Sequence, residues 1–352
     1  MKNNFQKEIH YLIETTKNTG INDLPKVLIN HLGTFFDLES TINFSSTNKK
    51  FKNLFSEFRK AFIYLNQINL LDDFIPKEEL EKYATKNEFL FSISKEKDFS
   101  MLQSRSKYNL LQVEIQKPNP QLETVKLLLE YKCSVNLENN SSFNSLEMLS
   151  RDSNSLNLDL FKLLVEYKAD INKNNKQKGN ILNYVCENLN NSLEIVQFLV
   201  ENKCRVDHLN SLQNTPLHLA CENKNIKKEI IEYLISKKSE LNQKNYKKCI
   251  PLHCLCENKN SSLDIIRFLV EAKSDLNCES KYDGYPLHLA CSNENISLET
   301  IKYLIESKAD FYLPNFLDNT PSFIANNNKN LTKQFLTFYP NQTIEETFEK
   351  FK

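Results

Sequence analysis

The feature that most constrains this sequence is a short phrase that returns at a fixed interval. The phrase reads TPLHLACENKN from Thr215, IPLHCLCENKN from Ile250 and YPLHLACSNEN from Tyr285, with 35 residues from each copy to the next. Weaker copies extend the period toward the N-terminus, and its central leucine falls at Leu111, Leu146, Leu182, Leu217, Leu252 and Leu287. A period of this length predicts a stack of similar units, because a single unit cannot bury its apolar face alone.

A second phrase follows each copy of the first after eleven or twelve residues. It reads LEIVQFLVENK from Leu193 and LDIIRFLVEAK from Leu263, and its apolar residues recur at the spacing of one buried helix face. In the first phrase, Thr215 can cap a helix whose first residue is Pro216. Each unit is therefore predicted to be a helix, a polar loop, a second helix and a hairpin-like connection, which makes the fold all-α.

Three stretches of one unit, TPLHLAC, EIIEYLI and SELN, together resemble the ankyrin repeat. The resemblance implies an ankyrin-type helical solenoid, in which a Thr-Pro-Leu-His segment opens the first helix and its histidine hydrogen-bonds the backbone of an adjacent connection. The residues that carry this motif are Thr215, Pro216, Leu217, His218, Pro251, Leu252, His253, Pro286, Leu287 and His288. The family period is roughly 33 residues. We assign the additional residues here to the loop between the helices, where a longer loop costs little.

A further departure concerns the residue after the second helix, where the family usually has glycine. Lysine occupies that position in each unit, at Lys132, Lys168, Lys203, Lys238, Lys273 and Lys308. A residue other than glycine costs roughly 1–2 kcal/mol in the left-handed conformation. Either the array tolerates this strain, or its helices end in a different way.

Four segments are expected along the chain. Residues 1–76 form a helical N-terminal region of unknown role, with a stripe of apolar residues through FKNLFSEFRKAFIYLNQINLL. Residues 77–104 are a degenerate N-terminal capping unit, 105–315 are six ankyrin-like repeats, and 316–352 are a degenerate C-terminal capping repeat and tail. In this last segment Ser322 replaces the buried leucine and the helical signals are weak, as expected of an end unit.

Composition limits the partners and compartments that are compatible with this chain. Its 45 basic and 45 acidic side chains cancel, so no basic excess indicates nucleic acid binding. No apolar run reaches the roughly 18 residues of a membrane span, and the polar start is unlike a secretory signal. Nine cysteines without a compact framework suit a reducing compartment. We expect a monomeric, cytoplasmic protein that binds neither nucleic acid nor membranes.

Three His-Cys pairs suggest a metal site at first sight: His218 with Cys221, His253 with Cys256, and His288 with Cys291. Successive pairs lie on helices about 8–10 Å apart, whereas zinc needs four ligands roughly 2.0–2.3 Å from one point. The same spacing argues against a ladder of disulfides. Cys254 adjoins His253, but neighbours along a helix do not face each other. Only 4 glycines are present, which argues against a glycine-rich phosphate loop, so we expect no metal, no cofactor and no catalytic residue.

The connections between units carry the candidate binding residues. Ankyrin-type arrays present a concave face of first helices and hairpin tips, whose exposed side chains are not needed for packing between repeats. The tips read NYKK at 245–248, SKYD at 280–283 and NFLD at 315–318. Their candidate partner-binding residues are Tyr246, Lys247, Lys248, Lys281, Tyr282 and Phe316. Exposed aromatic residues are favoured binding anchors, and the lysines beside them favour an acidic, partly apolar peptide. The alternative is that the rings fold back onto neighbouring tips.

Two functions are compatible with this pattern. The first is a non-catalytic interaction module, a scaffold or adaptor that holds a protein partner on the concave face of the repeats. The second is a regulatory or targeting subunit, whose N-terminal helical region docks on an enzyme complex while the repeats select its substrate. An enzyme remains an option only if residues 1–100 contain a site, and the sequence shows none there.

Overall fold

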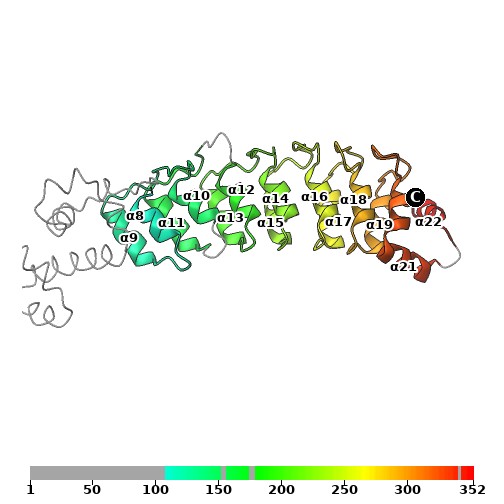
Figure 1. Ribbon diagram of the computed structural model, residues 1–352, viewed down its shortest axis with the longest axis horizontal. Helices are drawn as coiled ribbons and strands as arrows, with labels where there is room; N and C mark the ends of the chain where they lie inside the picture. Colours follow the sequence, from blue (N-terminus) through cyan, green and yellow to red (C-terminus); the bar gives the residue numbers. More distant parts are fainter. Residues whose placement is uncertain (1–107, 152–155, 174–178, 340–341) are drawn as a thin grey trace, which may run out of the picture. The chain divides into compact units, whose positions relative to one another are not determined.

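The computed structural model describes residues 108–151, 156–173, 179–339 and 342–352, whose regular elements are helices (Figure 1). Contacts divide the chain into two compact units. The first contains α9 and nearly all of α8, and the second comprises Ile115–Pro120 and Ser141–Lys352. The expectations for residues 1–76 and 77–104 fall outside the described residues.

Helices alternate between two positions in a repeating unit. The first helices are α8 (Leu110–Ile115), α10 (Ser145–Arg151), α12 (Ile181–Glu187), α14 (Pro216–Glu222), α16 (Pro251–Glu257), α18 (Pro286–Ser292) and α20 (Pro321–Asn327). The second helices are α9 (Leu122–Glu130), α11 (Leu158–Glu166), α13 (Leu193–Glu201), α15 (Lys228–Ser236), α17 (Leu263–Glu271), α19 (Leu298–Glu306) and α21 (Lys329–Phe338). A last helix, α22 (Ile344–Phe351), follows the final pair. This alternation confirms the predicted all-α repeat solenoid.

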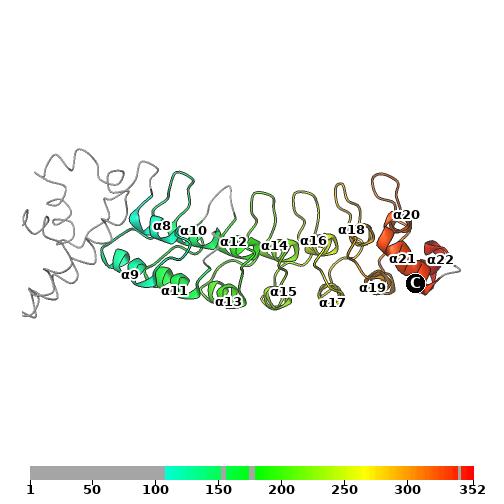
Figure 2. The same cartoon turned by 60° about the horizontal axis from the view of Figure 1, so that its bottom comes forward.

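Within residues 141–352, the two kinds of helix form two layers (Figure 2). Each first helix from α10 to α18 packs on the first helix of the next unit, and the second helices lie beside them. The connections that follow α13, α15, α17 and α19 project from the same side of the stack. Loops that are 35 residues apart in the sequence therefore become neighbours in space.

The first helix of each unit is positioned by its N-terminal cap and by a buried leucine. In α14 the hydroxyl oxygen of Thr215 accepts a hydrogen bond from the backbone N–H of His218 at 3.3 Å, and Pro216 occupies the first helical position. The leucines that define the period are buried along the whole array: Leu111, Leu146, Leu182, Leu217, Leu252 and Leu287. The structure thus has the register that the sequence predicts.

The lysine after each second helix adopts the left-handed conformation. Its φ angle lies between 59° and 79° at Lys132, Lys168, Lys203, Lys238, Lys273 and Lys308. After α15, the N–H of Lys238 donates to the carbonyl of Ile235, and the N–H of Ser239 donates to that of Leu234. This pair of bonds satisfies carbonyl groups at the end of the helix. The array therefore tolerates the strain, which is the first of the two alternatives raised by the sequence.

Replacing Lys238 with glycine should raise the free energy of unfolding by about 1 kcal/mol, because glycine has no Cβ to strain the left-handed backbone. The control is Lys237→Gly, one residue earlier, where φ is −91° and glycine only adds freedom to the unfolded chain. That control should lower stability by about 0.5–1 kcal/mol. Urea unfolding of both variants measures the difference, and an equal effect of the two substitutions would contradict the assigned cause.

A column of asparagines connects each unit to the preceding one. These residues end the first helices and are Asn188, Asn223, Asn258, Asn293 and Asn328. The side-chain amide of Asn223 donates to the carbonyl oxygens of Cys186 at 2.8 Å and Asn188 at 2.9 Å. Asn258, Asn293 and Asn328 repeat this pair of donated bonds toward their own preceding units. The column thereby adds hydrogen bonds between neighbouring repeats at carbonyl groups of the helix ends.

The C-terminal segment is more regular than its weak helical signals indicate. Helix α22 begins at a capping box, in which Thr343 Oγ1 accepts from the N–H of Glu346 and a Glu346 carboxylate oxygen accepts from the N–H of Thr343. Phe348 on this helix is fully buried, and its ring centroid lies 5.6 Å from those of Phe311 and Phe335. Helix α22 packs against α19 and α20, so it covers the end of the array.

Candidate protein-binding groove

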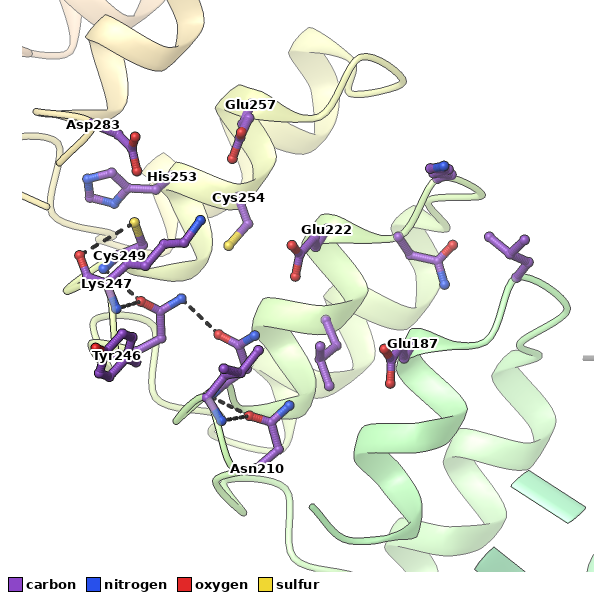
Figure 3. Close-up of a pocket in the computed structure, with 17 residues that line it drawn as sticks. Glu187, Asn210, Glu222, Tyr246, Lys247, Cys249, His253, Cys254, Glu257 and Asp283 are labelled. Atoms are coloured by element: carbon purple, nitrogen blue, oxygen red, sulfur yellow. Dashed lines mark hydrogen bonds between the residues drawn. The ribbon is translucent and has the colours of Figure 1, made fainter. Parts of the chain in front are cut away.

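A groove lies where the first helices α12, α14 and α16 meet the connections between units (Figure 3). Its volume is about 450 Å³. The floor is formed by residues of the helices, among them Glu187, Glu222 and Glu257, and the rim by connection residues such as Leu212 and Tyr246. The groove therefore belongs to the surface on which the repeats were expected to bind a partner.

The tips beside the groove are held by asparagine side chains. Oδ1 of Asn245 accepts hydrogen bonds from the N–H groups of Lys247 at 2.9 Å and Cys249 at 3.0 Å, which closes the turn. Asn210 and Asn315 close the neighbouring turns in the same way. Adjacent tips are also joined through their backbones, because the N–H of Tyr246 donates to the carbonyl of Leu212 at 3.0 Å. The rim is thus a hydrogen-bonded row of turns.

The structure brings four of the six candidate tip residues together. The Lys281 ammonium lies 5.6 Å from the ring centroid of Tyr246 and 4.8 Å from that of Tyr282. The rings of Tyr282 and Phe316 meet edge to face with centroids 6.5 Å apart. Tyr246, Tyr282 and Phe316 are nevertheless 62%, 46% and 59% exposed. The rings therefore touch neighbouring tips, as the alternative expected, and still present about half of their surface to solvent.

The two remaining candidate residues lie elsewhere on the same turn. Lys247 lines the groove. Lys248 takes a left-handed conformation, with φ at 59°, and its N–H donates to the carbonyl of Asn245 at 2.8 Å. The backbone of Lys248 thus helps to form the turn, and its exposed side chain is the one candidate that the structure links to neither the rings nor the groove.

The histidines of the repeated motif are built into the backbone network. His218 Nδ1 accepts from the N–H of Thr215 at 3.2 Å, and its Nε2 donates to the carbonyl of Cys249 at 3.0 Å. A backbone N–H can only donate and a carbonyl can only accept, so these partners require the neutral ring with its proton on Nε2. The Nε2 atoms of His253 and His288 bond the carbonyls of Gly284 and Asn319 in the following connections. This is the contact that the family resemblance implies.

Burial also affects the protonation of these histidine rings. It lowers the pKa of His218 and of His253 to about 4, because the charged ring would lose its hydration. Both side chains are at most 1% exposed. The rings are therefore neutral structural groups at pH 7.

The cysteines of the motif occupy small buried positions. Cys186, Cys221, Cys256 and Cys291 are fully buried, and burial raises the pKa of each thiol, to about 12 at Cys256. Burial also raises the pKa of Cys254 well above its ordinary value. A high pKa keeps a thiol protonated and poorly nucleophilic. Within the described ranges, no three His, Cys, Asp or Glu side chains are grouped as a metal site would require.

One feature of the groove was not anticipated from the sequence. Glu187, Glu222 and Glu257 recur 35 residues apart, and Figure 3 shows their carboxylates on the same side of three successive helices. Burial in the groove raises the pKa of Glu222, and the negative charge of Glu257 raises it further, whereas Lys247 lowers it. The period itself was the signal that could have revealed this column, because these residues directly precede the asparagines of the array.

The fold defines a class of protein, a helical repeat solenoid. A family model described as ankyrin repeats, in three copies, matches residues 146–245, 228–315 and 252–343. These matches cover more than half of the chain, and the protein belongs to the ankyrin repeat family. Ankyrin repeats are generally protein–protein interaction modules, and the family is typically non-catalytic. A search of curated proteins finds no match. None of the described helices combines the length and apolar character of a membrane span.

Proposed function

We propose that this protein is a non-catalytic scaffold or adaptor that holds a protein partner on the concave face of its repeats. The observation that carries the proposal is the row of exposed aromatic side chains, Tyr246, Tyr282 and Phe316, beside a groove between the first helices. Aromatic residues that are held in place and still exposed lose little freedom on binding and bury a large area. The turns that carry them are already hydrogen-bonded, which lowers the cost of association.

The proposal includes a reducing, cytoplasmic location and a monomeric chain. All nine cysteines are free, and eight of them are buried. The alternative function, a subunit whose N-terminal region docks on an enzyme complex, depends on residues 1–76, which lie outside the described part of the chain. No observation among the described residues favours it over the scaffold.

The test compares partner capture by the wild-type chain with capture by a triple variant, Tyr246→Ala/Tyr282→Ala/Phe316→Ala. Removing the three rings should weaken capture at least tenfold, since truncating an interface anchor typically costs about 2 kcal/mol or more. The control is Leu336→Ala/Phe338→Ala, which removes two side chains that are each 60% exposed from α21, one of the second helices. The control should capture partners normally. Equal capture by both variants and the wild type would refute the concave face as the binding surface.

A further inference from the structure

We propose that the groove binds an extended peptide segment of the partner through a lysine or arginine side chain that has an apolar neighbour. The inference rests on the proposed function, because it specifies the chemistry of the partner on the same face. Two properties of the groove carry it: the charge of its floor and the apolar character of its rim.

The floor of the groove is rich in carboxylates, and none of them forms a close ion pair within the described part of the chain. Glu187, Glu222 and Glu257 are the last residues of α12, α14 and α16, and Asp283 lines the groove at the next connection. Among the described residues, no lysine or arginine lies within ion-pair distance of any of these four. The two cations that line the groove are Lys224 and Lys247, so negative charge remains in excess.

The rim of the groove is apolar and open. Leu189, Leu212 and Tyr246 line it and are 48%, 58% and 62% exposed. The long aliphatic part of a lysine or arginine can pack along such side chains while its charged end reaches the carboxylates below. An apolar residue next to it in the peptide would cover the rest of the rim. The volume of about 450 Å³ accommodates a few side chains of one extended segment.

The negative charge of the groove floor argues against the acidic peptide that the lysines of the tips indicate. The Lys281 ammonium lies over the rings of Tyr246 and Tyr282 and is not among the residues that line the groove. An acidic side chain that entered the groove would meet the four carboxylates, and like charges placed together across an interface oppose binding. A cation instead relieves the repulsion between Glu222 and Glu257. Charge complementarity therefore selects a basic segment.

The stability of the free protein should respond to the same carboxylates. The pKa of Glu222 is raised in the folded state. Such a carboxyl group contributes stability below its unfolded pKa and loses that contribution as the pH rises through its folded pKa. At pH 7 the ionised group therefore opposes folding, and Glu222→Gln should raise the Tm. A residue retained for binding at a cost to stability behaves in this way, whereas a purely structural residue lowers the Tm when it is replaced.

The binding test uses the full chain and a phage-displayed library of random peptides. Selected peptides should contain lysine or arginine next to Leu, Ile, Val, Phe or Tyr. The strongest is then synthesised with a fluorescent label, and its Kd is measured by anisotropy. Glu222→Gln/Glu257→Gln should raise that Kd about tenfold or more, and added salt should weaken binding to the wild type. The matched control is Glu201→Gln/Glu271→Gln, at the last residues of α13 and α17, which should leave the Kd unchanged.

The possible results separate this inference from the proposed function. Selected peptides that are acidic or uncharged, or a Kd that is unaffected by the floor variant, would overturn the basic partner. If such peptides still lose binding in the variant Tyr246→Ala/Tyr282→Ala/Phe316→Ala, the concave face keeps its proposed function. If no selected peptide loses binding in either the rim variant or the floor variant, both the basic partner and the proposed function of the concave face are overturned.

Discussion

Replacing Asn223 with alanine should lower the free energy of unfolding by about 2 kcal/mol, because a buried amide that donates to two carbonyl groups is lost and only the bonds from Asn191 remain to them. These groups belong to Cys186 and Asn188 in the preceding unit, and both bonds are 2.8–2.9 Å long. Asn223 is only 5% exposed, so water cannot readily replace the amide. In a repeat array, stability depends on the interfaces between neighbouring units. The loss should therefore also reduce the cooperativity of urea unfolding.

The matched control is Asn225→Ala, two residues along the same loop. The amide of Asn225 also donates to the preceding unit, to the carbonyl of Leu189 at 2.9 Å, but both groups are exposed to water. Solvent can satisfy that carbonyl after the substitution, so the expected loss is below about 1 kcal/mol. Similar losses for the two variants in urea unfolding would show that the asparagine column does not stabilise the array through buried bonds.

Acidification from pH 7 to pH 4 should destabilise the protein through its buried histidines. The pKa of His218 and of His253 falls from 6.5 to about 4 on folding, so between these values the unfolded chain binds more protons than the folded one. Stability is therefore fully present above pH 6.5 and is lost as the pH falls toward 4. The loss amounts to at most about 3 kcal/mol for each histidine. The free energy of unfolding, measured by urea titration at each pH, gives the slope.

The role of the histidines can be tested with asparagine, which already occupies the same position in one repeat of this chain. Asn183 occupies the histidine position of its unit, accepts from the N–H of Asn180 at 2.8 Å and donates to the carbonyl of His208 at 3.1 Å. His218→Asn/His253→Asn should therefore keep both bonds without a titrating ring and flatten the pH dependence. His208→Asn, at a half-buried ring whose pKa is also lowered by burial, serves as the comparison and should flatten the slope less than the double variant does. An equal slope in the wild type and the double variant would assign the acid sensitivity to carboxyl groups.

Much of the array could be predicted from the sequence because its determinants are local. Thr215 caps α14 through a bond three residues away, and the leucines one period apart are buried in successive first helices. The sequence also identifies the lysines that follow the second helices. It leaves open whether the helices end there in the left-handed conformation. The weakest prediction concerned residues 316–352. Phe348 and Phe351 lie in a polar stretch of sequence that gives no sign of burial. They are buried because α22 packs over Phe311 and Phe335.

The period of 35 residues, the helix pairs and the positions of the tips follow from the sequence alone, since each depends on contacts within a unit or on the step between units. Only the tertiary structure shows which side chains about one period apart lie close to one another. It showed that asparagines bond the carbonyls of the preceding unit, and that Glu187, Glu222 and Glu257 gather on one groove floor. The physical reason is that a hydrogen bond or a repulsion between units depends on how closely and at what rotation the units stack, which no single unit encodes.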